Sequence, residues 1–245
     1  MDPRTQGGII TGRGTTAQAE VDLGLRAHML KVYNYMALGL ALTGVIAYAF
    51  SQYLLSNPAA AKAVFGSPLV WVVMLAPLAI VFFLSFRIHK MSLGTAQISY
   101  WLYAAINGIS FAAIFLMYTQ ASVAKVFFIT AASFGALSLY GYTTKRDLSG
   151  MRSFLVVGVV GLFIAMIVNI FLKSSGLDFA ISAIGVLLFA GLTAYDTQKI
   201  KEIYYGVAGD ATSMGKAAIM GALQLYLDFI NMFLFLLRLF GASRE

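Results

Sequence analysis

Two aspartates stand out because each lies inside a long apolar stretch. Asp228 lies near the middle of the apolar run Ala217–Phe240, and Asp196 lies near the end of the preceding run. In a membrane-spanning helix a carboxylate costs roughly 2.5–3.5 kcal/mol at the bilayer centre, so such residues face a protein interior or an aqueous cavity and usually serve a function. These two residues are therefore the main candidates for chemistry.

Such a pair could act as a proton switch. Two carboxylates held within a few ångströms cannot both ionise cheaply, so the pair is expected to take up protons as one unit. When both are ionised they attract a cation, either an arginine or a hard ion such as Ca²⁺, which takes about six to eight oxygen ligands. Asp196 and Asp228, together with amide oxygens, carbonyls and water, could hold Ca²⁺ transiently, and loose coordination suits a path that must release its ion.

Other polar residues could support the pair. On the last apolar run, Gln224, Asp228, Asn231 and Arg238 recur at steps of four, three and seven, which places them on one helical face. That polar stripe needs partners, so we expect this helix to lie inside a bundle.

Two charged residues at the membrane edge, Arg87 and Asp196, each have two possible roles. Arg87 ends the second apolar run at the depth expected for Asp196. It is either a residue that only sets topology or a latch that pairs with the ionised aspartates and is released on protonation. Asp196 is either a member of the aspartate pair or an ordinary helix-end partner of Lys199.

Composition places the chain among integral membrane proteins. Of its 245 residues 60% are hydrophobic and 11% charged, whereas soluble domains carry about 25% charged residues. Mean hydropathy is +0.83. The net charge of +7 comes from basic residues that cluster between apolar runs, which indicates membrane topology rather than nucleic-acid binding. Cysteine is absent, which excludes disulfides, thiolate metal sites and a cysteine nucleophile.

Seven runs are long enough to cross a bilayer core of about 30 Å as helices. They cover roughly 32–55, 68–86, 96–118, 123–143, 154–172, 179–198 and 218–240. None alternates polar and apolar residues like a membrane β-strand, so we expect an all-α bundle. Residues 1–25 are predicted to be a disordered polar tail and residues 26–245 the membrane domain, with an uncleaved first helix. Small residues four apart, such as Ala190 and Ala194, permit close helix approach.

The distribution of lysine and arginine predicts the topology. With the N-terminus inside, the cytoplasmic segments carry 12 basic residues and the other side 5, so the N-terminus is predicted to be cytoplasmic and the C-terminus outside. A bacterial inner membrane is expected, with an organellar membrane as the alternative.

Three stretches resemble the Bax inhibitor-1 family of seven-helix membrane proteins. They are Phe134–Leu148, Ala194–Gln198 and Leu225–Phe233. Their order and spacing, together with the span count, extend the resemblance over the chain after about residue 25. The chain departs from the family at Asn107, because many members carry an acid there, before the glycine of the third span.

The resemblance implies a bundle with the last helix at its centre, wrapped by the other six. It also implies a pH-sensitive Ca²⁺ leak governed by Asp196 and Asp228, with Arg87 as the lock. Family members are linked to cell-death suppression in eukaryotes and to control of membrane proteolysis in bacteria. Because Asn107 stands where many family members carry an acid, an ion path lined by several carboxylates is less certain in this chain. Calcium is expected as the transported ion, with no other cofactor.

An enzyme is the first rival reading. Intramembrane aspartyl proteases place a Tyr-Asp pair on one helix, as Tyr195 and Asp196 do, but they need Gly-x-Gly-Asp on the next, where Asp228 follows Leu225-Tyr226-Leu227. The only histidines, His28 and His89, lie far apart in sequence, so the usual three-ligand zinc site cannot be assembled from them. We therefore expect no enzyme.

The second rival is a regulator that transports nothing and binds another membrane protein. The small packing residues serve that reading equally well. The two readings differ at Asp228, because a regulator could survive replacement by the uncharged Asn, whereas a proton-gated path should not.

Overall fold

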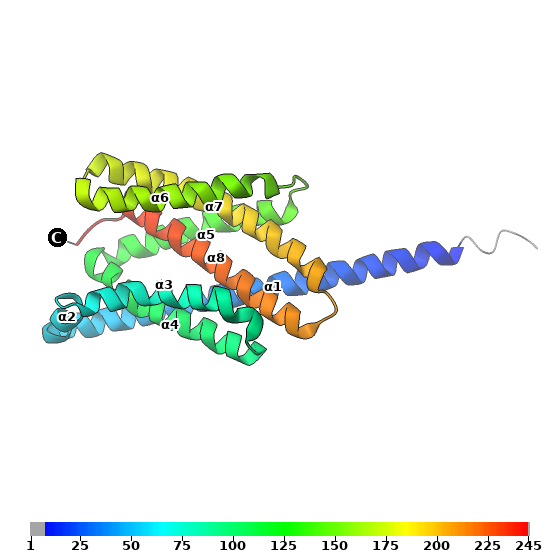
Figure 1. The fold of residues 1–245 in the computed structure, drawn as a ribbon, viewed down its shortest axis with the longest axis horizontal. Helices are drawn as coiled ribbons and strands as arrows, with labels where there is room; N and C mark the ends of the chain where they lie inside the picture. The colour runs from blue at the N-terminus through cyan, green and yellow to red at the C-terminus, as the bar shows by residue number, and fades with distance from the viewer. Residues whose placement is uncertain (1–7, 245) are drawn as a thin grey trace, which may run out of the picture.

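The structure, a computed structural model, is a bundle of long helices (Figure 1). It describes the backbone of residues 8–244 and the side chains of residues 21–244 apart from His89. The helices are α1 Gly8–Ser56, α2 Pro58–Phe65, α3 Leu69–Arg87, α4 Leu93–Met117, α5 Gln120–Thr143, α6 Arg152–Leu172, α7 Ser175–Val207 and α8 Ala211–Phe240. Short 3₁₀ turns lie at Ile88–Lys90 and Ser149–Met151.

The predicted fold class is confirmed. Within the described residues, seven helices are long and apolar enough to cross a membrane, namely all except α2. Each begins within a few residues of its predicted start apart from α1 and α8, which begin earlier. The eighth helix, α2, is short and was not predicted, because its residues Pro58–Phe65 read as part of the connection between two spans.

Polar side chains fix where several helices begin. Ser92, Thr119 and Ser174 each accept a hydrogen bond from a backbone N–H of the first turn of α4, α5 and α7. Asp210 does the same for α8, accepting from the N–H groups of Thr212 and Ser213 at 3.2 and 2.9 Å. The hydrogen bonds from Ser213 and Thr212 hold the pKa of Asp210 below its usual value.

Helix α8 is the centre of the bundle. It packs against α1, α4, α5 and α7, and 67% of its most apolar window is buried, compared with 11% for α3 and for α6. Figure 1 shows α8, coloured orange to red, running obliquely between α6 and α7 on one side and α3 and α4 on the other. Helix α3 packs mainly on α4, and α6 packs on α7, so these two form an outer layer.

Two segments are more helical than predicted. The backbone of residues 8–25, expected to be a disordered tail, continues α1 without a break, whereas residues 1–7 lie outside the described part. Helix α7 runs nine residues past Gln198, to Val207. Both extensions follow from helix cooperativity, because adding a residue to an existing helix is far easier than nucleating one.

Close approach between α5 and α7 depends on small residues. A Cβ placed on Gly141 of α5 would clash with the backbone oxygen of Ala194 on α7. Asp196 lies two residues after Ala194 on α7, so this contact sets the position of the α7 segment that carries Asp196. A Cβ placed on Gly135, further back on α5, meets nothing within 4 Å.

We expect Gly141→Ala to destabilise the bundle, because the new methyl group must push against backbone. Overpacking typically costs about 1–3 kcal/mol, and for a chain of this size each kcal/mol lowers the melting temperature by about 2–4 °C. Thermal unfolding in detergent measures the effect. Gly135→Ala is the matched control on the same helix and should keep or slightly raise the melting temperature, because alanine is the better helix former and its methyl group meets open space. Equal melting temperatures for both variants would contradict the assigned contact.

Candidate functional site

The structure brings Asp196 and Asp228 together. Asp196 projects from α7 and Asp228 from α8, and the side chains are only 8% and 4% exposed. Both side chains line the same cavity, and their carboxyl groups lie close enough to act on each other electrostatically. Within the described residues, the Oδ2 atom of Asp228 is buried and has no hydrogen-bond partner.

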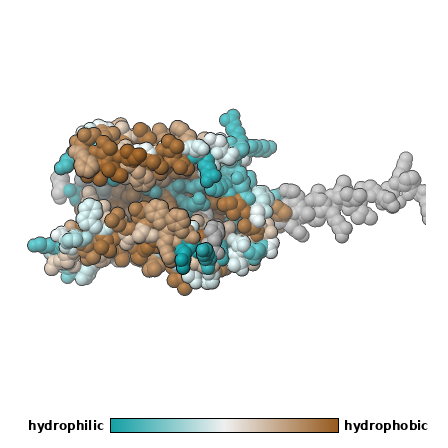
Figure 2. All heavy atoms as spheres, in the orientation of Figure 1, coloured by the Kyte–Doolittle hydropathy of each residue, from teal (hydrophilic) through white to brown (hydrophobic). Residues whose placement is uncertain are grey.

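Both aspartates line one cavity of about 450 Å³, here called the carboxylate cavity. Its walls come from α3, α4, α6, α7 and α8, so it lies between the central helix and the outer layer. Figure 2 shows a hollow between the upper and lower groups of helices of Figure 1, flanked by apolar side chains. The polar lining residues are Tyr103, Asn107, Ser110, Asp196, Gln224, Asp228 and Asn231.

The two polar residues that follow Asp196 hold α7 in place. Thr197 lies within 2.9 Å of the Ser138 hydroxyl on α5, which in turn lies 2.7 Å from the Tyr33 hydroxyl on α1. Gln198 accepts a hydrogen bond from the N–H of Leu148 and donates one to the carbonyl of Arg146, each at 2.8 Å. These bonds use the polar groups of Thr197 and Gln198, which leaves Asp196 as the residue of this motif that faces the cavity.

In the wall of the carboxylate cavity formed by α3, a side chain of α4 replaces a missing backbone hydrogen bond. Pro77 lies inside α3 and has no N–H, so the carbonyl of Val73, four residues earlier, loses its helical partner. The hydroxyl of Ser110, on α4, donates to that carbonyl at 2.5 Å. Such compensation by a neighbouring helix is what permits proline within a membrane span. Both Pro77 and Ser110 line the carboxylate cavity.

Asn107 is a site residue that the sequence indicated only as a departure from the family pattern. It is 4% exposed on α4, lines the carboxylate cavity and lies beside the hydroxyls of Tyr103 and Tyr226. Tyr226 also lies 2.8 Å from the Thr43 hydroxyl of α1, which donates to the carbonyl of Ala104. An amide, and not a carboxylate, thus lines the cavity at this position of α4. Its helical spacing from Ser110, at i+3, is the signal that could have placed both on one face.

A second cavity, of about 380 Å³, is here called the vestibule. It lies between the C-terminal part of α7 and the N-terminal part of α8. Its polar lining residues are Lys199, Ser213, Lys216 and Gln224. Gln224 lines the vestibule and the carboxylate cavity, so its partly buried side chain separates the two spaces. Asn231, one helical turn beyond Asp228, donates to the carbonyl of Leu227 at 2.8 Å, which leaves its Oδ1 atom available to the cavity.

The cations singled out from the sequence lie apart from the aspartates. Arg87 is exposed at the end of α3 and, within the described part of the chain, forms no ion pair with either aspartate. Its neighbour Ile88 lines the vestibule. Lys199 Nζ lies 5.9 Å from the ring centroid of Tyr195, and among the described side chains Lys199 forms no ion pair with Asp196.

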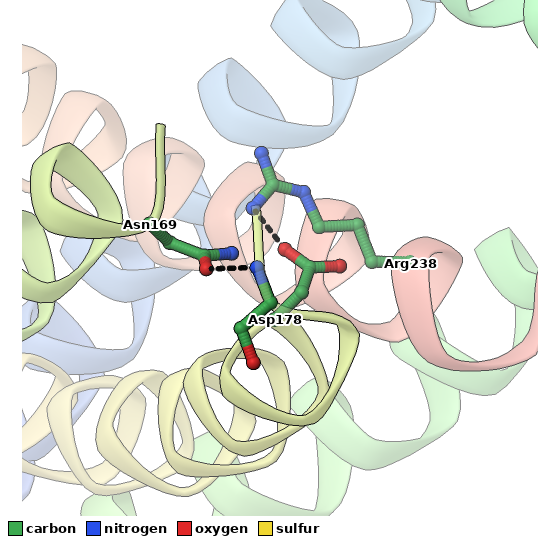
Figure 3. Close-up of polar contacts among 4 residues, drawn as sticks. Asn169, Asp178 and Arg238 are labelled. Atoms are coloured by element: carbon green, nitrogen blue, oxygen red, sulfur yellow. Dashed lines mark hydrogen bonds and ion pairs between the residues drawn. The ribbon is translucent and has the colours of Figure 1, made fainter. Parts of the chain in front are cut away.

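Arg238, the last member of the predicted stripe, serves the far end of the bundle. Its Nη1 atom lies 3.9 Å from Oδ1 of Asp178, and both side chains are about half exposed. Figure 3 shows this ion pair beside Asn169, whose Oδ1 accepts from the N–H of Ser174 at 3.0 Å. These contacts link α6, α7 and α8 at the end opposite the vestibule. Exposed ion pairs contribute little to stability, so Arg238 has a local rather than a cavity role.

The site offers two carboxylates rather than a full metal centre. Among the residues with described side chains, no group of three or more His, Cys, Asp or Glu could hold a metal ion. His28 is buried against Tyr204, with ring centroids 5.5 Å apart, and it does not line the carboxylate cavity. Any cation bound at the aspartate pair would therefore take its remaining ligands from amide oxygens and water.

Comparison with known proteins gives matches over nearly the whole chain. The model of a family described as "Inhibitor of apoptosis-promoting Bax1" matches residues 25–245. The chain is 48% identical to an uncharacterized protein of Caulobacter vibrioides, over 94% of each chain. It is also 48% identical to the uncharacterized protein RP147 of Rickettsia prowazekii, over 94% of this chain and 96% of that one. It is 44% identical to the inner membrane protein YbhL of Escherichia coli, over 90% of this chain and 94% of that one.

We expect Asp228→Asn to raise the melting temperature in detergent at an alkaline pH, where a free carboxyl group is ionised. The substitution keeps the shape of the side chain and removes a charge from a buried position whose Oδ2 atom has no partner. Asp178→Asn, at an exposed position, is the control and should change the melting temperature little. A lower melting temperature for Asp228→Asn would indicate that the carboxylate is satisfied by a partner.

Proposed function

The chain belongs to the Bax inhibitor-1 family of multi-pass membrane proteins, and we propose that it is a pH-sensitive Ca²⁺ leak governed by Asp196 and Asp228. The observation that carries this proposal is that two buried carboxyl groups line one cavity, with one oxygen atom of Asp228 unpartnered among the described residues. Burial of such groups in a membrane protein is costly and usually reflects a functional site. Protonation of the pair changes its charge, and with it the attraction for a cation.

Calcium suits the ligands that the cavity offers. Ca²⁺ prefers oxygen ligands in flexible geometry, and the cavity combines two carboxylates with the amide side chains of Asn107, Gln224 and Asn231. Water completes the coordination. The resulting site holds the ion loosely, as a site on a conduction path must, because tight binding would prevent release.

The proposed path begins at the vestibule and passes Gln224 into the carboxylate cavity. Beyond Asn231, α8 continues with large apolar side chains, and Phe233, Phe235 and Leu237 are buried against the neighbouring helices. This segment closes the path toward Arg238. A hydrophobic constriction of this kind opens by separation of the helices that form it.

The proposed orientation places the vestibule in the cytoplasm. The segments that carry most of the lysine and arginine are expected to be cytoplasmic, which puts the N-terminus inside and the C-terminus outside. We propose the bacterial inner membrane as the location, consistent with the printed name of the relative YbhL. Asp196 then lies nearer the cytoplasmic surface than Asp228.

Arg87 is the proposed latch. It lies next to the vestibule residue Ile88, and one face of the same helix reaches the carboxylate cavity at Val81. Since Arg87 is exposed and apart from the aspartates in the described conformation, the latch would form in a different conformation, in which its guanidinium group turns toward the ionised pair.

A regulator of another membrane protein is the second candidate function. It is favoured by the exposed apolar faces of α3 and α6, which are only 11% buried in the bundle and so offer surface for a partner helix. This function requires the shape of the bundle but not the charge of Asp228.

For the leak, purified protein in liposomes should show a Ca²⁺ flux that depends on pH, and Asp196→Asn or Asp228→Asn should flatten that dependence. Asn cannot ionise but fills nearly the same space, so the variants remove only the proton switch. The measurement is the flux into dye-loaded liposomes across a pH series. Asp178→Asn, in the exposed ion pair with Arg238, is the matched control and should behave like the wild type.

Flux with the same pH dependence in both variants as in the wild type would exclude the aspartate mechanism. Absence of flux in the wild type, with a native melting curve, would favour the regulator.

For the latch, Arg87→Ala should raise the flux at a pH where the aspartate pair is ionised, because the competing cation has been removed. Lys90→Ala, three residues further on and also exposed, controls for loss of positive charge at the same membrane edge. An equal rise in both variants would indicate a general surface-charge effect and would remove Arg87 from the mechanism.

A further inference from the structure

A crevice of about 510 Å³ separates α1 from α5 and lies apart from the carboxylate cavity, with which it shares no lining residue. Five of its residues come from α1 and five from α5. They are Arg26, Met29, Leu30, Tyr33 and Met36, and Phe134, Gly135, Ser138, Leu139 and Tyr142. Each set follows the spacing of one helical face, so the crevice runs along both helices.

Among the side chains that the structure describes, none fills this crevice. A Cβ placed on Gly135 would meet nothing within 4 Å, and Leu30 and Leu139 at its rim are 52% and 61% exposed. The lining is almost wholly apolar, because the hydroxyls of Tyr33 and Ser138 are turned to each other at 2.7 Å. An apolar hollow of this size within a membrane span fits an apolar chain and not water.

The length of the crevice matches one leaflet. Arg26 and Met36 are ten residues apart on α1, which corresponds to about 15 Å along a helix. The hydrocarbon core of a bilayer is about 30 Å thick, so one leaflet contributes about half of that. A single acyl chain that starts at Arg26 therefore ends near Met36.

The end of the crevice at Arg26 is positively charged. Arg26 is exposed and, within the described side chains, forms no ion pair with a carboxylate. By the alternation of the spans, Tyr142 lies at this same end, and its carbonyl accepts a hydrogen bond from Lys201 Nζ at 3.1 Å. Lys201 also lies 5.5 Å from the ring centroid of Tyr142. Two cations thus border the end where a lipid headgroup would lie.

We propose that this crevice binds an anionic phospholipid of the bilayer, with one acyl chain between α1 and α5 and the phosphate group at Arg26. Basic pockets at the ends of membrane helices recognise anionic headgroups through the same combination of charge and apolar surface. A guanidinium group suits phosphate because it can donate two parallel hydrogen bonds. The zwitterionic lipid phosphatidylcholine offers the same acyl chains without net charge and should bind less tightly.

The test is a titration of the detergent-solubilised protein with phosphatidylglycerol or phosphatidylcholine of matched chains, read by native mass spectrometry and by melting temperature. The wild type should bind phosphatidylglycerol at least about fivefold more tightly, the factor expected from one basic residue near an anionic headgroup. Gly135→Leu fills the crevice and should abolish binding of one molecule of either lipid. Gly161→Leu places the same side chain in open space on α6 and should bind as the wild type does.

Arg26→Gln keeps the apolar crevice and should lose the preference between the two lipids while still binding both. This exposed substitution does not depend on whether Gly135→Leu folds. The proposal is overturned if the wild type shows no preference, if folded Arg26→Gln keeps the full preference, or if folded Gly135→Leu still binds one phosphatidylglycerol molecule.

Discussion

The burial of Asp196 and Asp228 in one cavity is the constraint on which the rest of the arrangement depends. Two carboxyl groups cannot be exposed to lipid, so the helices that carry them must face each other inside the protein. Helix α8 accordingly occupies the centre, with α1, α4, α5 and α7 around it. The amide and hydroxyl groups of α4 and α8 then line the space beside the pair instead of facing the surrounding membrane.

Holding the pair together requires α7 to be fixed from its other side. The close approach of Gly141 to Ala194 sets the distance between α5 and α7. The hydroxyls of Tyr33, Ser138 and Thr197 then join α1, α5 and α7 across the interior. Small residues and hydroxyl contacts are the usual means of helix association in a membrane, where lipid is as apolar as leucine. The acidic site therefore rests on contacts that themselves carry no charge.

Hydropathy and charge predicted the architecture well, because burial in lipid acts on each helix separately. The seven spans follow from the length of the apolar runs. The placement of Asp196 and Asp228 near each other follows from the free-energy cost of an isolated carboxylate in the membrane. Residues 8–25 were predicted to be disordered, but their backbone is helical. Amino-acid composition does not show how readily a helix that has already formed in the membrane extends beyond it.

The cavity was harder to predict than the spans, because it depends on how each helix is rotated about its axis. Nothing in one sequence specifies that Gln224 separates two spaces, or that Ser110 and Asn107 face the aspartates. The repair of the Val73 carbonyl by Ser110 likewise needs the rotation of α4 relative to α3. The role of Arg87 as a latch stays a prediction, since its side chain lies away from the pair in this conformation.

The two hydrogen bonds of Gln198 give the loop between α5 and α6 a mechanical role. Because both run to backbone atoms, at Arg146 and Leu148, the loop must follow α7 whatever side chains it carries. A tilt or slide of α7 that separates Asp196 from Asp228 would thus displace a loop exposed to water. An event buried among the helices is thereby reported at the surface of the protein, where a soluble molecule could detect it.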